Sequence, residues 1–334
     1  MATKKLRQSK KSCAFFGTND ILTFSLVDYR NNYFISNDPN KIIEFYNGFE
    51  NRYQLIQWMR ERPKGIAAIH EVEGDKEVIV VIPTADFNGK YARECRESIF
   101  KGLHIIFVVS GEVPDPYFNY AHNCNVGIKK AMEYNPKWVV VSNDDMYKID
   151  DINKLESQLQ MVPKDSDVIY AVSPGHRLSM KYYIGVATIL YEFLNLFRRK
   201  FRFLSKIKKN IPPKIEIISE FDTGPGIVRK IVKLFLIRSI KNSQEFLSIG
   251  SFGIFSNRFI RDMKGSLFDE VYINIGEDTD LSYRIFSGKV RTYEIKYKIG
   301  DLVGGSFGVG EDRFLRSLTG KVYFFEKFKT IFSK

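Results

Sequence analysis

Four apolar runs, spaced about 30 residues apart, constrain the fold of this chain more than any other feature. They comprise residues 78–82, 105–109, 138–141 and 168–172, and Val and Ile dominate them. Runs without polar alternation are typical of strands buried on both faces of a parallel sheet. Because each intervening stretch is long enough for a helix, the pattern predicts βαβ units and an α/β domain.

The segments around these runs extend the prediction. Residues 125–134 carry apolar side chains on one helical face, and an Asn-Pro pair ends that pattern before the third run. Residues 293–299 alternate between apolar and charged side chains, which predicts a half-buried strand at the far side of the sheet. Before the first run, residues 53–59 resemble a helix and only residues 32–36 resemble a strand.

The composition indicates a folded protein from a reducing compartment. Of the 334 residues, 44% are hydrophobic, which is enough for a large core and excludes extensive disorder. The three cysteines are an odd number without metal-site spacing, so we expect neither a disulfide framework nor a zinc site. No apolar stretch follows the basic N-terminus as a secretory signal requires, and we therefore expect a cytoplasmic protein.

The net charge of +12 is distributed unevenly. Residues 198–241 hold an excess of ten positive charges, with apolar residues interleaved among them. The apolar stretch 184–197 is shorter than the ~20 residues that span a bilayer. The basic insert, residues 180–241, is therefore interpreted either as a segment lying on an anionic membrane surface or as surface helices with a solvated basic face. Because the charge is confined to one insert, nucleic-acid binding explains it less well.

The C-terminal segment, residues 316–334, is expected to form an amphipathic helix. Five apolar side chains share one helical face, at Phe324, Phe325, Phe328, Ile331 and Phe332. This face either packs in the core or anchors the protein to a membrane, and the sequence leaves both interpretations open.

Two acidic motifs follow strand-like stretches, where ligand sites of open α/β sheets gather. The first is Ser142-Asn143-Asp144-Asp145. Its oxygen atoms are typical ligands of Mg²⁺ or Mn²⁺, and such ions keep coordination positions for water and phosphate oxygens. A turn or a helix start is the alternative interpretation, since Asn and Asp are common there.

The second acidic motif begins at Gly276 and carries Glu277, Asp278 and Asp280. A strand-like stretch, residues 271–275, precedes it, and we expect a helix to begin within the motif. The N-terminal end of a helix attracts acidic residues on its own. Three carboxylates within four residues nevertheless exceed what capping needs, and a carboxylate held near a hydroxyl group is what general-base catalysis requires.

Four fragments, in this order and spacing, resemble the family 2 inverting glycosyltransferases. They are a strand ending in Ile82-Pro83-Thr84, the stretch 125–131, the first acidic motif, and the stretch 268–284 that contains the second. The likeness covers roughly residues 76 to 310, and the combination of four fragments is more specific than any one of them.

The resemblance implies a GT-A (Rossmann-like) fold with a mostly parallel sheet flanked by helices, a nucleoside-diphosphate sugar donor, and a divalent cation, Mn²⁺ or Mg²⁺. It implies that Asp278 is the catalytic base, with Glu277 beside it. Asp145 would be the principal metal ligand, with Asp144 beside it and Asp301 as a further candidate. Around the donor the resemblance places Pro83, Thr84, Asp86, Ser110, Asn125, Asn143 and Asp144.

The chain also departs from the family pattern. Ser110 follows the second strand, where the family commonly has an acid that reads the nucleobase. Cys124 replaces an arginine that could neutralise phosphate, and Asp301 is the candidate substitute for a metal-ligating histidine of some members. The identity of the nucleotide in the donor therefore stays open.

We expect three parts: an N-terminal extension (1–75), a transferase domain (76–315) that contains the basic insert, and the C-terminal amphipathic helix (316–334). The expected enzyme moves a sugar, with inversion, to the hydroxyl of a glycan acceptor or to a lipid phosphate. It would work in the cytoplasm, peripherally on the inner face of the cell membrane. The alternatives are a catalytically inactive scaffold of the same fold and a basic protein that binds nucleic acid or membrane.

Overall fold

The computed structural model describes residues 30–111, 115–172, 177–181, 243–302 and 311–332. Residues 182–241 of the predicted basic insert (180–241) lie outside these ranges, so its association with membranes stays a prediction. None of the helices that the structure describes combines the length and the apolar character needed to cross a membrane.

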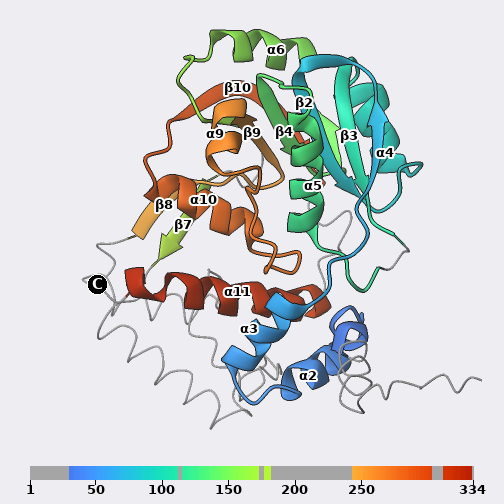
Figure 1. Ribbon diagram of the computed structural model, residues 1–334, viewed down its shortest axis with the longest axis vertical. Coiled ribbons are helices and arrows are strands. Elements are labelled where there is room, and N and C mark those ends of the chain that lie inside the picture. Colours follow the sequence, from blue (N-terminus) through green and yellow to red (C-terminus); the bar gives the residue numbers. More distant parts are fainter. Residues whose placement is uncertain (1–29, 112–114, 173–176, 182–242, 303–310, 333–334) are drawn as a thin grey trace, which may run out of the picture.

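An eight-stranded sheet forms the centre of the molecule, as Figure 1 shows. In spatial order its strands are β1 (Ala68–Val72), β3 (Leu103–Val109), β2 (Asp75–Thr84), β4 (Trp138–Ser142), β9 (Phe252–Ser256), β6 (Val168–Val172), β10 (Thr292–Asp301) and β5 (Met146–Lys148). The four apolar runs and the alternating stretch all lie within strands, which confirms the α/β class.

The sheet is mixed, whereas the sequence predicts a mostly parallel one. The pairs β2–β3, β2–β4 and β6–β10 are parallel, and the other four neighbouring pairs are antiparallel. The main cause is β9, a short buried strand that runs antiparallel between β4 and β6. Strands β2, β3, β4, β6 and β10 still point in one direction, so their carboxyl ends meet at a single edge of the sheet.

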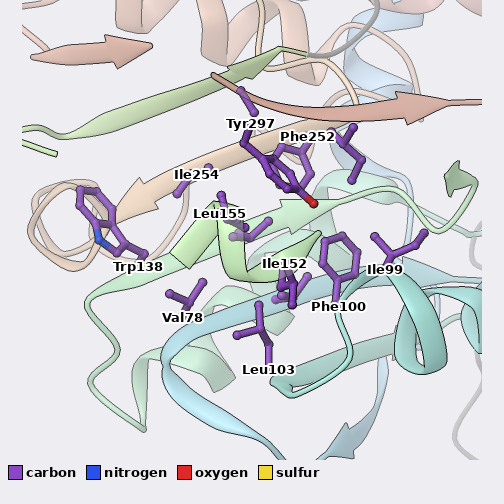
Figure 2. Close-up of a cluster of buried hydrophobic side chains, with 14 of the residues drawn as sticks. Val78, Ile99, Phe100, Leu103, Trp138, Ile152, Leu155, Phe252, Ile254 and Tyr297 are labelled. Atoms are coloured by element: carbon purple, nitrogen blue, oxygen red, sulfur yellow. The ribbon is translucent and has the colours of Figure 1, made fainter. Parts of the chain in front are cut away.

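Helices cover both faces of the sheet. On one face lie α4 (Lys90–Glu94), η1 (Cys95–Ile99) and α6 (Ile152–Met161). On the other lie α5 (Tyr120–Met132), α9 (Asn257–Asp262) and α10 (Glu277–Ser287). Figure 2 shows part of the first core, with Ile152 and Leu155 of α6 near Val78 and Ile254 of the sheet. On the second face, a Cβ atom at Gly127 would lie 2.3 Å from Val81, so glycine permits the close approach of α5 to β2.

A third layer holds α2 (Pro39–Asn47), α3 (Arg52–Glu61) and α11 (Glu311–Phe332), and Figure 1 places α11 between α10 and the other two helices. The Tyr46 hydroxyl donates to the backbone oxygen of Leu315 at 2.5 Å. Phe324 and Phe328 are buried, with ring centroids 5.9 and 4.9 Å from Tyr283 of α10. For these two aromatic residues the core interpretation is therefore right. The side chains of Phe325, Ile331 and Phe332 lie outside the described part.

Two shorter segments differ from their predictions. Residues 30–34 are helical, although 32–36 resemble a strand, and residues 271–275 form an irregular, bent segment in place of a strand. Both segments bury aromatic residues in the third layer, where Phe34 and Tyr272 belong to one cluster. A hairpin of β7 (Arg177–Lys181) and β8 (Ser243–Leu247) borders the undescribed part of the insert.

The N-terminal segment contacts both the sheet and the segment that leads into α5. Strand β1 pairs with β3, and buried Arg62, just after α3, donates at 2.7 Å to Asn31 and also to the backbone oxygens of Pro116 and Phe118. Burial lowers the pKa of Arg62 to about 10. Residues 30–75 therefore pack against the segment that leads into α5, and the division of the chain into domains stays a prediction.

Candidate functional site

The carboxyl ends of β2 and β3 bring several predicted donor-binding residues together. Thr84 ends β2, and its hydroxyl donates to Asp144 Oδ2 at 2.7 Å. Ser110 follows β3, and its N–H and hydroxyl lie 3.2 and 3.4 Å from the Thr84 backbone oxygen. Pro83 is buried within β2, and Asp86 is exposed just beyond it. These residues border one edge of the sheet.

The first acidic motif leaves the adjacent strand β4 at the same edge. The Asn143 N–H donates to the Ser251 backbone oxygen at 2.9 Å, and the buried Asp145 accepts from the Leu302 N–H at 3.0 Å through its backbone oxygen. Asp301 ends β10 and accepts from the Ser251 hydroxyl. Burial raises the pKa of Asp301, and the neighbouring Asp145 carboxylate raises it further. Asp145 and Asp301 are therefore neighbours, as the metal prediction requires.

Within the described residues, no group of three or more His, Cys, Asp or Glu side chains is arranged to hold a metal ion. Asp144, Asp145 and Asp301 thus do not form a three-carboxylate cage. Mg²⁺ is usually bound by only one or two carboxylates, with water and substrate phosphates completing its coordination. The pair Asp145 and Asp301 is consistent with that open kind of site.

The second acidic motif forms the first turn of α10, directly after Gly276, whose φ is +101°. Glu277 is 6% exposed, and its Oε2 has no hydrogen-bond partner among the residues that the structure describes. Burial, followed by the charges of Asp278 and Asp280, raises the pKa of Glu277 to about 8. Asp278 is partly exposed and accepts from the Thr279 N–H at 2.7 Å, and burial raises its pKa as well.

Asp280 differs from its two acidic neighbours because it is fully buried and paired. It accepts from Arg284 Nε at 2.6 Å and from the Tyr272 hydroxyl at 3.1 Å, and its Oδ2 lies 2.6 Å from Lys327 Nζ. Lys327 of α11 also donates to Asp269 at 2.6 Å. These contacts give Asp280 a structural role between α10 and α11.

Tyr120 joins the two acidic motifs and was not predicted from the sequence. Its hydroxyl donates to Asn143 Oδ1 at 2.8 Å. Burial raises the pKa of Tyr120 well above its usual value, and the neighbouring Cys124, Glu277 and Asp278 raise it further. The hydroxyl thus contacts the first motif, and the carboxylates of the second are close enough to affect its pKa. A tyrosine in the first turn of a helix carries no sequence signal for this role.

Asn125, a predicted donor-binding residue, is engaged by the segment that precedes α10. Its Nδ2 donates to the Phe268 backbone oxygen at 2.9 Å and to Glu270 Oε1 at 3.0 Å, and its Oδ1 accepts from the Phe268 N–H at 3.1 Å. His122 lies 3.1 Å from the same Glu270 carboxylate. These contacts fix the segment 266–270 against α5, and a contact of Asn125 with the donor remains untested.

Comparison of the chain with protein-family models and with curated proteins finds no match. The candidate site is therefore described by its own contacts. Tyr120 contacts Asn143 of the first acidic motif, and burial, together with the charges of Glu277 and Asp278 in the second motif, raises its pKa. Asp144 of the first motif accepts from the Thr84 hydroxyl at the carboxyl edge of the sheet.

Proposed function

We propose that this protein is a glycosyltransferase of the GT-A type, which moves a sugar from a nucleoside-diphosphate sugar to an acceptor with inversion. The observation that supports this most is the contact of Tyr120 with Asn143 on one side and its proximity to Glu277 and Asp278 on the other. Tyr120 thereby relates the acidic motif after β4, which carries candidate cation ligands, to a candidate base. The motif lies at the edge where open α/β sheets bind ligands.

In this proposal the donor diphosphate lies against the ends of β2, β3 and β4. Asp145 and Asp301 would hold Mn²⁺ or Mg²⁺. Asp144 would lie beside the ion, held in place by its hydrogen bond with Thr84. The bound ion would supply positive charge that stabilises the leaving diphosphate. Pro83, Asp86, Ser110 and Asn143 would border the nucleotide and the diphosphate. We assign Asn125 to holding the segment before α10.

We infer different roles for the two candidate catalytic acids from their different surroundings. With a pKa of about 8, buried Glu277 carries a proton at neutral pH and cannot accept one. Asp278 is partly exposed, and Thr279 fixes its Oδ1. Because burial raises its pKa, Asp278 is a stronger base than a fully solvated carboxylate. We therefore assign Asp278 as the base that deprotonates the acceptor hydroxyl.

The proposed acceptor is a glycan hydroxyl or a phosphate carried on a lipid. Such a lipid acceptor suits the basic, apolar insert, because both the lipid phosphate and the inner membrane surface are anionic. We accordingly propose that the enzyme works in the cytoplasm, peripherally on the inner face of the cell membrane.

Release of nucleoside diphosphate from a panel of nucleotide sugars tests this function. The full chain would be assayed with Mn²⁺ and with lipid phosphate or glycan acceptors. We expect at least one donor to be consumed, and we expect EDTA to stop the reaction. Full activity in EDTA would exclude the proposed role of the metal. Binding of nucleotides without consumption of any donor would support the inactive scaffold.

A further inference from the structure

We propose that Tyr120 is a positioning residue, which holds the Asn143 side-chain amide so that its NH₂ group points to the donor site and binds anionic oxygens. The identity of the ligand, a nucleoside diphosphate, rests on the proposed function. The orientation of the amide rests on the contacts of Tyr120 and Asn143 alone.

The tyrosine is fixed at both of its ends. Asn119 caps α5 by accepting from the His122 N–H at 2.9 Å, and the Tyr120 N–H donates to Asn274 Oδ1 at 2.8 Å. At the far end of the side chain, the hydroxyl donates to Asn143 Oδ1 at 2.8 Å. The ring between them meets Phe268 edge to face, with the centroids 6.3 Å apart. Such a side chain can define the orientation of its partner.

The partner is fixed through its backbone as well. The Asn143 N–H donates to the Ser251 backbone oxygen at 2.9 Å, and the Asn143 backbone oxygen accepts from the Ser142 hydroxyl at 2.9 Å. Because a phenol hydroxyl has one proton and donates it here, the oxygen of the Asn143 amide faces Tyr120 and the NH₂ group faces away. No hydrogen bond among the described residues uses this NH₂ group.

The chemistry of this edge indicates what the NH₂ group binds. Asp144 and Asp145, which follow directly, present carboxylates that only accept hydrogen bonds when ionised. An anionic diphosphate beside them needs donors as well as a cation. Two N–H donors on an uncharged amide meet that need. Burial, followed by the neighbouring Cys124 and Glu277, raises the pKa of Tyr120 well above its usual value, so its hydroxyl stays protonated at neutral pH and can donate to Asn143.

A double-mutant cycle tests this inference. Titration calorimetry with Mn²⁺ would measure the affinity of UDP, GDP, ADP, CDP and dTDP for the wild type, and the tightest ligand would then be titrated into Tyr120→Phe, Asn143→Ala and the double variant. Loss of a hydrogen bond of about 1 kcal/mol predicts that Tyr120→Phe weakens binding roughly fivefold. In the Asn143→Ala background, Tyr120→Phe should have no further effect, because the amide that it orients is absent.

Tyr134→Phe is the matched control, since it removes a hydroxyl that donates to Glu71 at 2.6 Å just beyond the opposite end of α5. This variant should bind like the wild type. Equal affinity of Tyr120→Phe and the wild type would overturn the inference, and so would an equal loss in both Asn143 backgrounds, which would indicate a general structural effect. If the wild type binds none of the five ligands, the proposed function fails at the first step, and this inference fails with it.

Discussion

Three neighbouring carboxylates at the start of α10 have three different surroundings. Glu277 is buried, and one of its oxygens has no hydrogen-bond partner in the described part of the chain. Asp278 is partly exposed, and Asp280 is buried against Arg284 and Lys327. Helix capping alone would treat these acids alike, because each lies in the first turn. Their contacts instead distinguish them: Glu277 is a protonated acid, Asp278 is a potential base, and Asp280 belongs to a structural ion pair.

Replacing Asp278 with Asn should therefore abolish catalysis without abolishing binding. The change preserves the size of the side chain but removes the proton acceptor, so turnover should fall by about 10²–10⁴-fold. Donor affinity should change little, and Glu277→Gln should lower turnover less. Rates and donor affinities of both variants decide the assignment. Near-normal turnover of Asp278→Asn beside an inactive Glu277→Gln would move the base to Glu277.

The buried Glu277 carboxyl should also make stability depend on pH. Its pKa is 4.5 when solvated and about 8 in the folded protein, so between these values the unfolded chain binds fewer protons than the folded one. The folded state therefore loses stability as pH rises from about 5 to about 8, by up to about 1.4 kcal/mol per pH unit. Glu277→Gln lacks this titration. Denaturant unfolding at pH 5 and pH 8 should show that the variant gains stability relative to the wild type at the higher pH. An equal difference in unfolding free energy between variant and wild type at both pH values would contradict this titration of Glu277.

Some of these residues could be predicted from the sequence and others could not. Asp144, Asp145 and Asp278 follow strand-like or helix-start patterns, and such positions indicate sites without knowledge of the fold. Tyr120 and Ser251 contact Asn143 and Asp301, which are distant from them in the sequence. Only the folded chain brings those partners together.

At the scale of elements, α11 is the link between the N-terminal helices and the acidic helix. Arg52 of α3 lies 3.5 Å from Glu326, and Lys327, one residue further along α11, contacts both Asp269 and Asp280 at 2.6 Å. The first turn of α10 thus depends on packing that reaches back to residues 39–61. This explains why α11 holds charged residues beside its buried aromatic ones.

Lys327→Met should consequently destabilise the fold. The substitution leaves Asp280 fully buried and with one fewer cation, and breaking a buried ion pair on one side costs about 3 kcal/mol. Lys137→Met is the matched control, because its pair with Glu77 is exposed to solvent on both sides. Such a surface pair contributes little. Urea unfolding should separate the two variants, and equal midpoints would show that the link from α11 to α10 carries no stability.

The elements themselves were predictable where burial was continuous. The strands β2, β3, β4 and β6 are apolar on both faces because helices cover the sheet on both sides, and their runs identified them. Strand β9 has only five residues, and its first residue, Phe252, lies between a serine and a glycine. Its apolar pattern was therefore too short to recognise. The mixed character of the sheet follows from that strand and from the edge strands β1 and β5.

For the whole molecule, the net charge of +12 predicts salt-dependent binding to anionic vesicles. Attraction between the basic insert and anionic headgroups is screened over about 10 Å at 0.1 M salt. Cosedimentation with vesicles of phosphatidylcholine and phosphatidylglycerol should be strong at low salt and decrease as salt rises, and pure phosphatidylcholine vesicles are the control. If the protein does not sediment with anionic vesicles at low salt, the insert has no role on membranes.

We propose that one edge of the sheet binds a nucleoside diphosphate through a divalent cation. Titration calorimetry of the wild type and of Asp145→Ala, with Mn²⁺ and with EDTA, tests it most directly. Asp262→Ala, which removes an exposed carboxylate at the end of α9, is the control. We predict that the wild type and the control bind a nucleoside diphosphate more tightly with Mn²⁺ than in EDTA, and that Asp145→Ala loses this difference. Binding that is equally tight in EDTA, or Mn²⁺-dependent binding that persists in Asp145→Ala, would exclude a cation site at Asp145.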